Sequence, residues 1–165
     1  MQIEQAYVKF DNREKLIDSV KSILANENDV LDIDMETPNC FDLSLINDSK
    51  RKIGVSDLNG GWISILESSE FNDYTLLLTL SEKLGVTVVA VSYSDIIGGW
   101  GYAEFTGGTV SESFFSDEED NEEIDFDGLY DSVNGKLADY GIDIPIYTFR
   151  EIANTKKSGW VLLKK

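Results

Sequence analysis

Acidic side chains are the residues of this chain that could support catalysis. The sequence has 31 Asp and Glu residues, 14 Lys and Arg residues and no histidine. Two carboxylates whose pKa values are pushed apart can hydrolyse a glycosidic bond without another catalytic group. Asp57, Asp95 and Glu104 are candidates because each is expected within a strand or at a strand end. The alternative is a structural role for all three.

The sequence lacks the residues that other classes of reaction require. Without histidine there is no Ser–His or Cys–His nucleophile pair. Cys40 is the only cysteine, so the chain can form no internal disulfide and no zinc site of the Cys/His type, which needs about four such ligands. The glycine-rich stretches 98–101 and 106–109 match no phosphate-binding motif and are typical of hairpin turns. We therefore expect no catalytic residue of these classes and no cofactor.

One segment concentrates the negative charge. Residues 116–127, SDEEDNEEIDFD, contain eight acids and no Lys or Arg. The acids from Glu123 to Asp127, followed by Gly128, resemble the start of a calcium-binding loop, but Asn134 stands where the bidentate Glu is required. We therefore expect no metal site and interpret 116–127 as an acidic surface loop.

The formal net charge of −17 restricts the partners. Such a surface repels nucleic acid and anionic membranes and attracts basic proteins through its long-range field. Neither nucleic acid nor a membrane is therefore an expected partner, whereas a basic protein is; the oligomeric state is left open. The acidic candidates for partner binding are Asp117, Glu118, Glu119, Asp120, Glu122 and Glu123.

An aromatic strand supplies the other candidate site. Alternation along a strand places Trp100, Tyr102 and Glu104 on one face. If that face is exposed, aromatic rings beside a carboxylate suit a Lys or Arg of a partner through cation–π contacts. If it is buried, the two aromatic residues belong to the core. Phe114, Phe115 and Phe126, which flank the acidic segment, are expected to anchor its two ends.

The hydrophobic pattern predicts an α+β fold: a mainly antiparallel, twisted sheet with helices packed on one face, arranged as two unequal αβββ units. Asp11 is the predicted N-cap of the first helix, Gly85 ends the second, and Gly107-Gly108 predicts a hairpin. Residues 26–39 read as a loop. The whole chain, residues 1–165, is expected to form one domain.

Strands are predicted near 2–10, 40–46, 53–55, 62–67, 86–93, 100–106, 109–115 and 159–163, and helices near 12–25, 74–84 and 126–140.

The first ten residues, MQIEQAYVKF, lack the basic and then apolar pattern of a signal peptide. No window approaches the roughly 20 apolar residues that a membrane helix needs. We therefore expect a cytoplasmic protein.

Residues 61–115 combine a Gly-Trp strand (GWISILE), a helix ending LSEKLG, an apolar strand, an aromatic strand (WGYAEF) and a hairpin return (GGTVSESFFSD). This third of the chain resembles a module of small uncharacterised bacterial proteins and is similar to immunity proteins of bacterial toxin systems. The resemblance implies a cytoplasmic, non-enzymatic, partner-binding protein, and it carries over no functional residue.

Three hypotheses follow. The first is a non-enzymatic acidic binding protein, such as an immunity-type protein that neutralises a basic toxin domain. The second is a small hydrolase that uses a carboxylate pair on a neutral substrate. The third is a domain with no charge-dependent partner, since a high negative charge also keeps proteins soluble.

Overall fold

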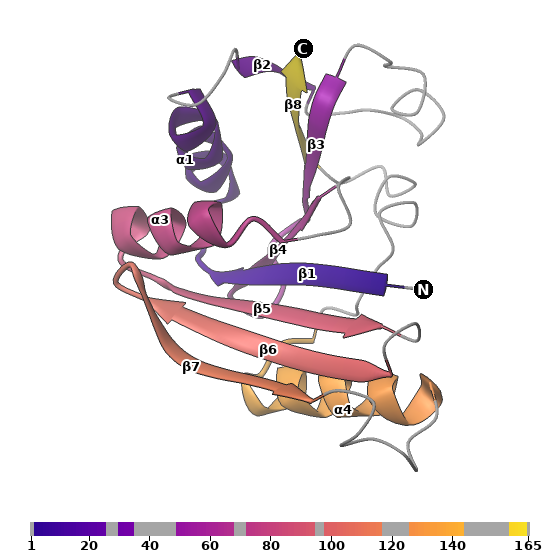
Figure 1. The fold of residues 1–165 in the computed structure, drawn as a ribbon. Helices are drawn as coiled ribbons and strands as arrows, with labels where there is room; N and C mark the ends of the chain where they lie inside the picture. The colour runs from indigo at the N-terminus through magenta and orange to yellow at the C-terminus, as the bar shows by residue number, and fades with distance from the viewer. Residues whose placement is uncertain are drawn as a thin grey trace.

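A computed structural model of the chain describes residues 2–25, 30–34, 49–67, 72–94, 98–116, 126–143 and 159–164. Within these ranges the chain forms eight strands and three helices (Figure 1). In chain order they are β1 (Gln2–Lys9), α1 (Arg13–Ala25), β2 (Val30–Asp34), β3 (Ser49–Val55), β4 (Trp62–Glu67), α3 (Tyr74–Leu84), β5 (Thr87–Ser94), β6 (Gly99–Thr106), β7 (Thr109–Ser116), α4 (Phe126–Asp139) and β8 (Gly159–Lys164).

The eight described strands form one sheet in the order β2-β8-β3-β4-β1-β5-β6-β7. Every pairing in it is antiparallel, which confirms the predicted α+β class. The N-terminal strand β1 lies in the middle, between β4 and β5. Among the described elements the order αβββ occurs twice, but the two units are unequal because β8 separates β2 from β3 in the sheet.

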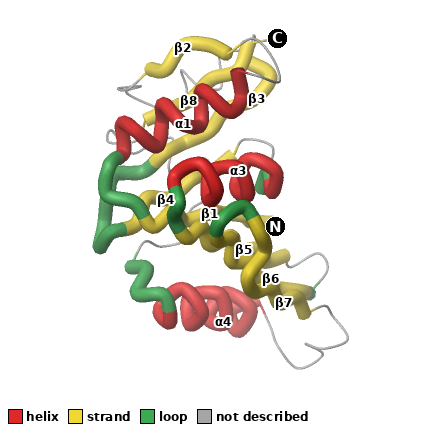
Figure 2. The backbone as a smooth tube through the Cα atoms, turned by 90° about the vertical axis from the view of Figure 1, so that its left-hand side faces the viewer, coloured by secondary structure: helices red, strands yellow, loops and turns green. Residues whose placement is uncertain are grey.

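Helices cover both faces of this sheet. Helices α1 and α3 pack together on one face, and α4 lies on the other (Figures 1 and 2). The prediction of helices on one face thus holds for α1 and α3 and is wrong for α4. The physical reason is that the second face of the central strands is also apolar: Tyr7, Val89 and Val91 are buried there and require a cover.

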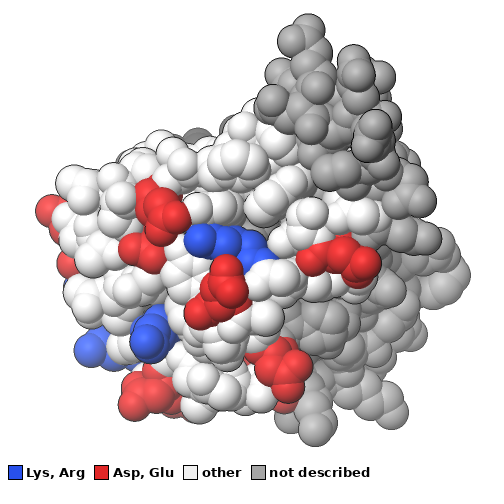
Figure 3. Space-filling view, turned by 90° about the horizontal axis from the view of Figure 1, so that it is seen from below, with Lys and Arg blue, Asp and Glu red and all other residues white. Residues whose placement is uncertain are grey.

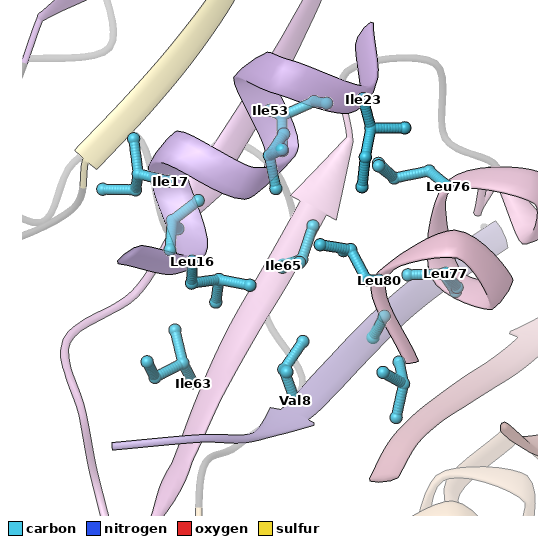
Figure 4. Packing of buried hydrophobic residues seen from close by; sticks show 14 of the residues in the cluster. Val8, Leu16, Ile17, Ile23, Ile53, Ile63, Ile65, Leu76, Leu77 and Leu80 are labelled. Carbon is cyan, nitrogen blue, oxygen red and sulfur yellow. The ribbon is translucent and has the colours of Figure 1, made fainter. Parts of the chain in front are cut away.

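Two apolar clusters result from this arrangement. The larger one joins α1 and α3 to one face of β1, β3, β4 and β5 (Figure 4). Leu16 and Leu80 come from its helices, and Val8, Ile63 and Ile65 come from its strands. The smaller cluster lies under α4 and contains Tyr7, Trp62, Val89, Val91, Tyr93, Val133, Leu137 and Ile142.

Several local predictions change at the ends of elements. The N-cap of α1 is Asn12 and not Asp11, because the Asn12 side chain accepts a hydrogen bond from the backbone N–H of Lys15 at 2.9 Å. Residues 30–34, predicted as loop, form the edge strand β2, which pairs with β8. Its pairing residues lie about 130 positions away in the sequence, where a local pattern carries no signal. The predicted strand at 40–46 lies outside the described residues.

Glycine conformation fixes two of the turns. Gly107 and Gly108 have φ values of +59° and +79° and form the predicted hairpin turn between β6 and β7. Gly85 has φ of +64° at the C-terminus of α3, whose N-cap is Asp73. A side chain is strained in this left-handed conformation.

Replacing Gly85 with alanine should destabilise the protein by about 1 kcal/mol, because only glycine adopts this φ without strain. Gly135, an exposed residue inside α4, is the matched control: its added Cβ meets nothing within 4 Å. There Gly135→Ala should stabilise by up to about 1 kcal/mol, because alanine is the better helix former. Urea denaturation of both variants measures the two effects. Equal signs would contradict the different roles assigned to Gly85 at a helix end and Gly135 inside a helix.

Candidate functional site

The structure places Trp100, Tyr102 and Glu104 on one face of β6, as the alternation predicts. This face is the one covered by α4, and all three side chains are partly exposed. Both sequence-based alternatives for the aromatics are therefore partly right, because Trp100 and Tyr102 pack against the smaller core and still reach the surface. The predicted acidic residues Asp117, Glu118, Glu119, Asp120, Glu122 and Glu123 lie outside the described residues.

Phe114 of β7 joins these residues in an aromatic cluster, defined here as Trp100, Tyr102 and Phe114. Its ring centroid lies 5.0 Å from that of Trp100 and 6.1 Å from that of Tyr102. Phe114 keeps 44% of its surface exposed, and Phe115 keeps 56%. Phe114 therefore fits the expected anchoring role in part, because its ring packs on the cluster but stays partly exposed. Phe115 is more exposed, and no described strand covers the edge strand that carries both residues.

Lys136 of α4 contacts this aromatic cluster. Its ammonium lies 4.0 Å from the ring centroid of Tyr102 and 5.2 Å from that of Tyr140. It also pairs with Glu112 at an N–O distance of 3.4 Å, and the Tyr102 hydroxyl donates a hydrogen bond to the same carboxylate. Sequence analysis missed Lys136 and Glu112. The spacing of Lys136 and Tyr140 at i and i+4 on a helix was a usable signal for one of these contacts.

A β-bulge creates the carboxylate pair on this surface. The register between β6 and β7 shifts after Glu104, which leaves Ser111 as the extra residue and sets Glu104 opposite Glu112. Like charges directly opposite each other destabilise a sheet. Here Ser111 donates a hydrogen bond to Glu104 at 2.6 Å, and Lys136 neutralises Glu112. The two carboxylates are therefore tolerated side by side.

These contacts change the pKa values of Glu112, Tyr140 and Lys136. For Lys136, desolvation lowers the pKa of the ammonium, but the contacts with Tyr102 and Glu112 outweigh it and raise that pKa. The hydrogen bond from Tyr102, followed by the charge of Lys136, holds the pKa of Glu112 below its ordinary value. Burial, followed by the neighbouring Glu104 carboxylate, raises the pKa of Tyr140 well above that of a free tyrosine. At neutral pH the Glu112 carboxylate is therefore ionised and the Tyr140 hydroxyl is neutral.

Asp57 and Glu104, the two described acids among the three proposed for catalysis, are not brought together. Asp57 pairs with Arg13 at 3.8 Å, and that guanidinium also donates to the Val55 and Ser56 carbonyls, which is a structural arrangement. Asp95 lies outside the described residues. Glu104 faces Glu112, whose side chain is 53% exposed, so this pair lies on open surface. Within the described ranges no group of three acidic or cysteine side chains is placed to hold a metal ion.

The opposite face of the β6–β7 hairpin carries a hollow of about 370 Å³. Small residues form its floor: register pairs Ser92 with Gly101 and Ala103 with Ser113. A Cβ on Gly101 would lie 2.7 Å from the Phe114 carbonyl oxygen, so glycine is required there. No described residue that lines the hollow carries a carboxylate; the larger ones are Tyr74, Tyr102, Phe105, Val110, Phe114 and Phe115.

Comparison of the chain with protein-family models, with curated proteins and with solved structures finds no match. None of the helices in the described ranges is both long and apolar enough to cross a membrane. The function of the β6–β7 surface must therefore be inferred from the residues that form it.

Lys136→Met should lower the free energy of unfolding by about 1 kcal/mol, because it removes a cation–π contact and leaves Glu104 and Glu112 unneutralised. Lys83→Met is the control: its ammonium contacts Ser22 at an exposed position, so a change within about 0.5 kcal/mol is expected. Urea denaturation of both variants provides the measurement. Equal effects would show that Lys136 has no special role.

Tyr102→Phe should raise the pKa of Glu112 toward its ordinary value, since it removes the largest cause of the lowered pKa. Because folding lowers this pKa, the contacts of the carboxylate stabilise the fold at neutral pH, and this contribution is lost as the pH falls through the folded-state pKa. Carboxyl ¹³C NMR titration of the wild type and the variant measures the shift. An unchanged titration would exclude the hydrogen bond as its cause.

Proposed function

We propose that this chain is a non-enzymatic acidic binding protein whose β6–β7 surface recognises a basic protein. The surface consists of the aromatic cluster together with Glu104 and Glu112. The observation that carries the proposal is the contact of Lys136 with Tyr102 and Glu112. In this contact an aromatic ring and a carboxylate of the protein bind an ammonium group of the same chain. A lysine or arginine of a partner would be bound by the same kind of contact.

The part of the cluster that Lys136 does not contact is available to a partner. Phe114 is 44% exposed, and Trp100, whose ring lies 5.0 Å away at a tilt of 50°, is partly exposed. Aromatic residues of this kind carry much of the binding energy at protein interfaces. A partner lysine or arginine over Trp100 and Phe114 would repeat the arrangement at Lys136.

Charge supports the same conclusion. On the α4 side of the molecule acidic side chains are spread over the described surface, with basic ones between them (Figure 3). The acidic run 116–127 also begins at Ser116, the residue that pairs with Trp100. The net charge of −17 would speed the approach of a basic partner at low ionic strength.

Among basic partners, we favour a toxin domain that itself binds nucleic acid. The support is the resemblance of residues 61–115 to immunity proteins, and these residues contain both strands of the proposed surface. The hydrolase hypothesis has no comparable support, because Glu112 is exposed, Glu104 is partly exposed, and the described lining of the hollow contains no acid.

Phe114→Ala should weaken capture of the basic partner about tenfold, the equivalent of about 1.4 kcal/mol, because it removes an exposed ring from the cluster. Leu58→Ala is the matched control: Leu58 is 45% exposed in the loop between β3 and β4, so a change of less than about twofold is expected. The measurement is affinity capture with the tagged chain, followed by titration of the purified partner.

The salt dependence of the same complex tests its electrostatic part. Binding should be strong near 0.05 M salt and largely lost by about 0.5 M, where surface charges are screened over a few ångströms. A partner that is not basic, or one whose binding is insensitive to salt, would contradict the proposal.

A further inference from the structure

Among the described strands, β7 lies at one edge of the sheet. Of the described strands only β6 pairs with it, and seven of its eight residues are exposed. Its sequence, TVSESFFS, contains neither lysine nor proline, the residues that commonly protect edges from pairing. The bulge at Ser111 lies near the hairpin turn, and residues 112–116 continue in regular register. Their outer backbone groups are in the extended form that another strand can pair with.

The two sides of this edge differ in chemistry. Glu112 and Phe114 pair with Glu104 and Tyr102, so they lie on the side of α4. Val110, Ser113 and Phe115 pair with Phe105, Ala103 and Gly101 and border the hollow. Val110 and Phe115 are 53% and 56% exposed, which leaves apolar surface around a recess. A strand beside β7 would therefore meet carboxylate and ring on one side and an apolar hollow on the other.

Charge decides between the possible occupants of the edge. Two copies of this chain would each bring a net charge of −17 to a β7–β7 contact, and they would repel each other. A segment with Lys or Arg on alternate residues would instead pair with Glu112 and approach the acidic run that starts at Ser116. Its other residues, pointing to the hollow, would have to be apolar because side chains alternate along a strand.

We propose that β7 binds its partner by strand addition: an extended segment with alternating basic and large apolar residues becomes the next strand of the sheet. Its basic residues lie over Glu112 and the Trp100–Phe114 pair, and one apolar residue enters the hollow beside Ser113. Backbone hydrogen bonds supply affinity, and the alternation supplies specificity. This inference rests on the proposed function and adds the binding mode and the partner's sequence pattern.

Three peptides of about seven residues test the mode on the full chain. The first alternates lysine with leucine or phenylalanine, the second has the same composition with the alternation scrambled, and the third alternates serine with the same apolar residues. Titration followed by NMR should show the first binding at least tenfold more tightly than the second. Amide protons of residues 112–116 should gain protection from exchange in that complex alone.

Two protein variants locate the peptide. Ser113→Glu places a carboxylate at the hollow and should weaken the alternating basic peptide about tenfold or more, although it adds attractive charge. Thr109→Glu adds the same charge to β7 on the opposite face, away from the hollow, and should leave binding unchanged or slightly tighter. If both variants bind more tightly, charge alone drives binding and no apolar residue enters the hollow.

The remaining outcomes separate this inference from the proposed function. Equal, salt-sensitive binding of the alternating and scrambled basic peptides would overturn strand addition and leave recognition of basic partners intact. Equal binding of the serine and lysine peptides, with exchange protection in both, would support strand addition and contradict the preference for a basic partner. Absence of binding by all three would overturn both, and a concentration-dependent dimer with protected β7 amides would identify a second copy as the occupant.

Discussion

The central position of β1 is the constraint on which the rest of this structure depends. The N-terminal strand pairs with β4 on one side and with β5 on the other, so it joins the two parts of the sheet. Ala6 and Val8 face the cluster under α1 and α3, whereas Tyr7 faces the cluster under α4. The buried Gln5 donates a hydrogen bond to Ser64 of β4, which satisfies a polar group inside the sheet. Because both faces of β1 must be buried, a helix is required on each side.

The proposed surface follows from a smaller irregularity at the sheet's edge. The bulge at Ser111 sets Glu112 beside Glu104 and Phe114 beside Tyr102, and α4 then brings Lys136 across both strands. Repulsion between the glutamates is relieved by groups that the fold supplies, and the aromatic rings stay partly in water. Among the described residues, the Glu112 carboxylate is exposed and Glu104 is partly exposed, so rings and carboxylates lie together at the surface, as the proposed recognition of a basic partner requires.

The negative charge also bears on the edge strand β7, which lacks lysine and proline. An exposed, partly apolar strand invites self-association, which edge lysines commonly oppose in other proteins. Here the negative charge of the whole chain opposes self-association, because two copies that each carry a net charge of −17 repel each other. Charge can therefore exclude a second copy and still admit a basic partner. Solubility and partner choice would then have one physical origin.

The sequence by itself determined the α+β class, most elements and the face shared by Trp100, Tyr102 and Glu104, because hydrophobic period, caps and turn glycines are local signals. It could not determine which strands pair at long range, so β2 and the place of β8 between β2 and β3 were missed. Nor could it reveal the bulge: a regular ladder from Gly107-Gly108 pairs Tyr102 with Ser113, whereas the structure pairs it with Phe114. That one-residue shift reverses the face of every following side chain. Tertiary packing alone therefore decided that Glu112, Phe114 and Lys136 meet.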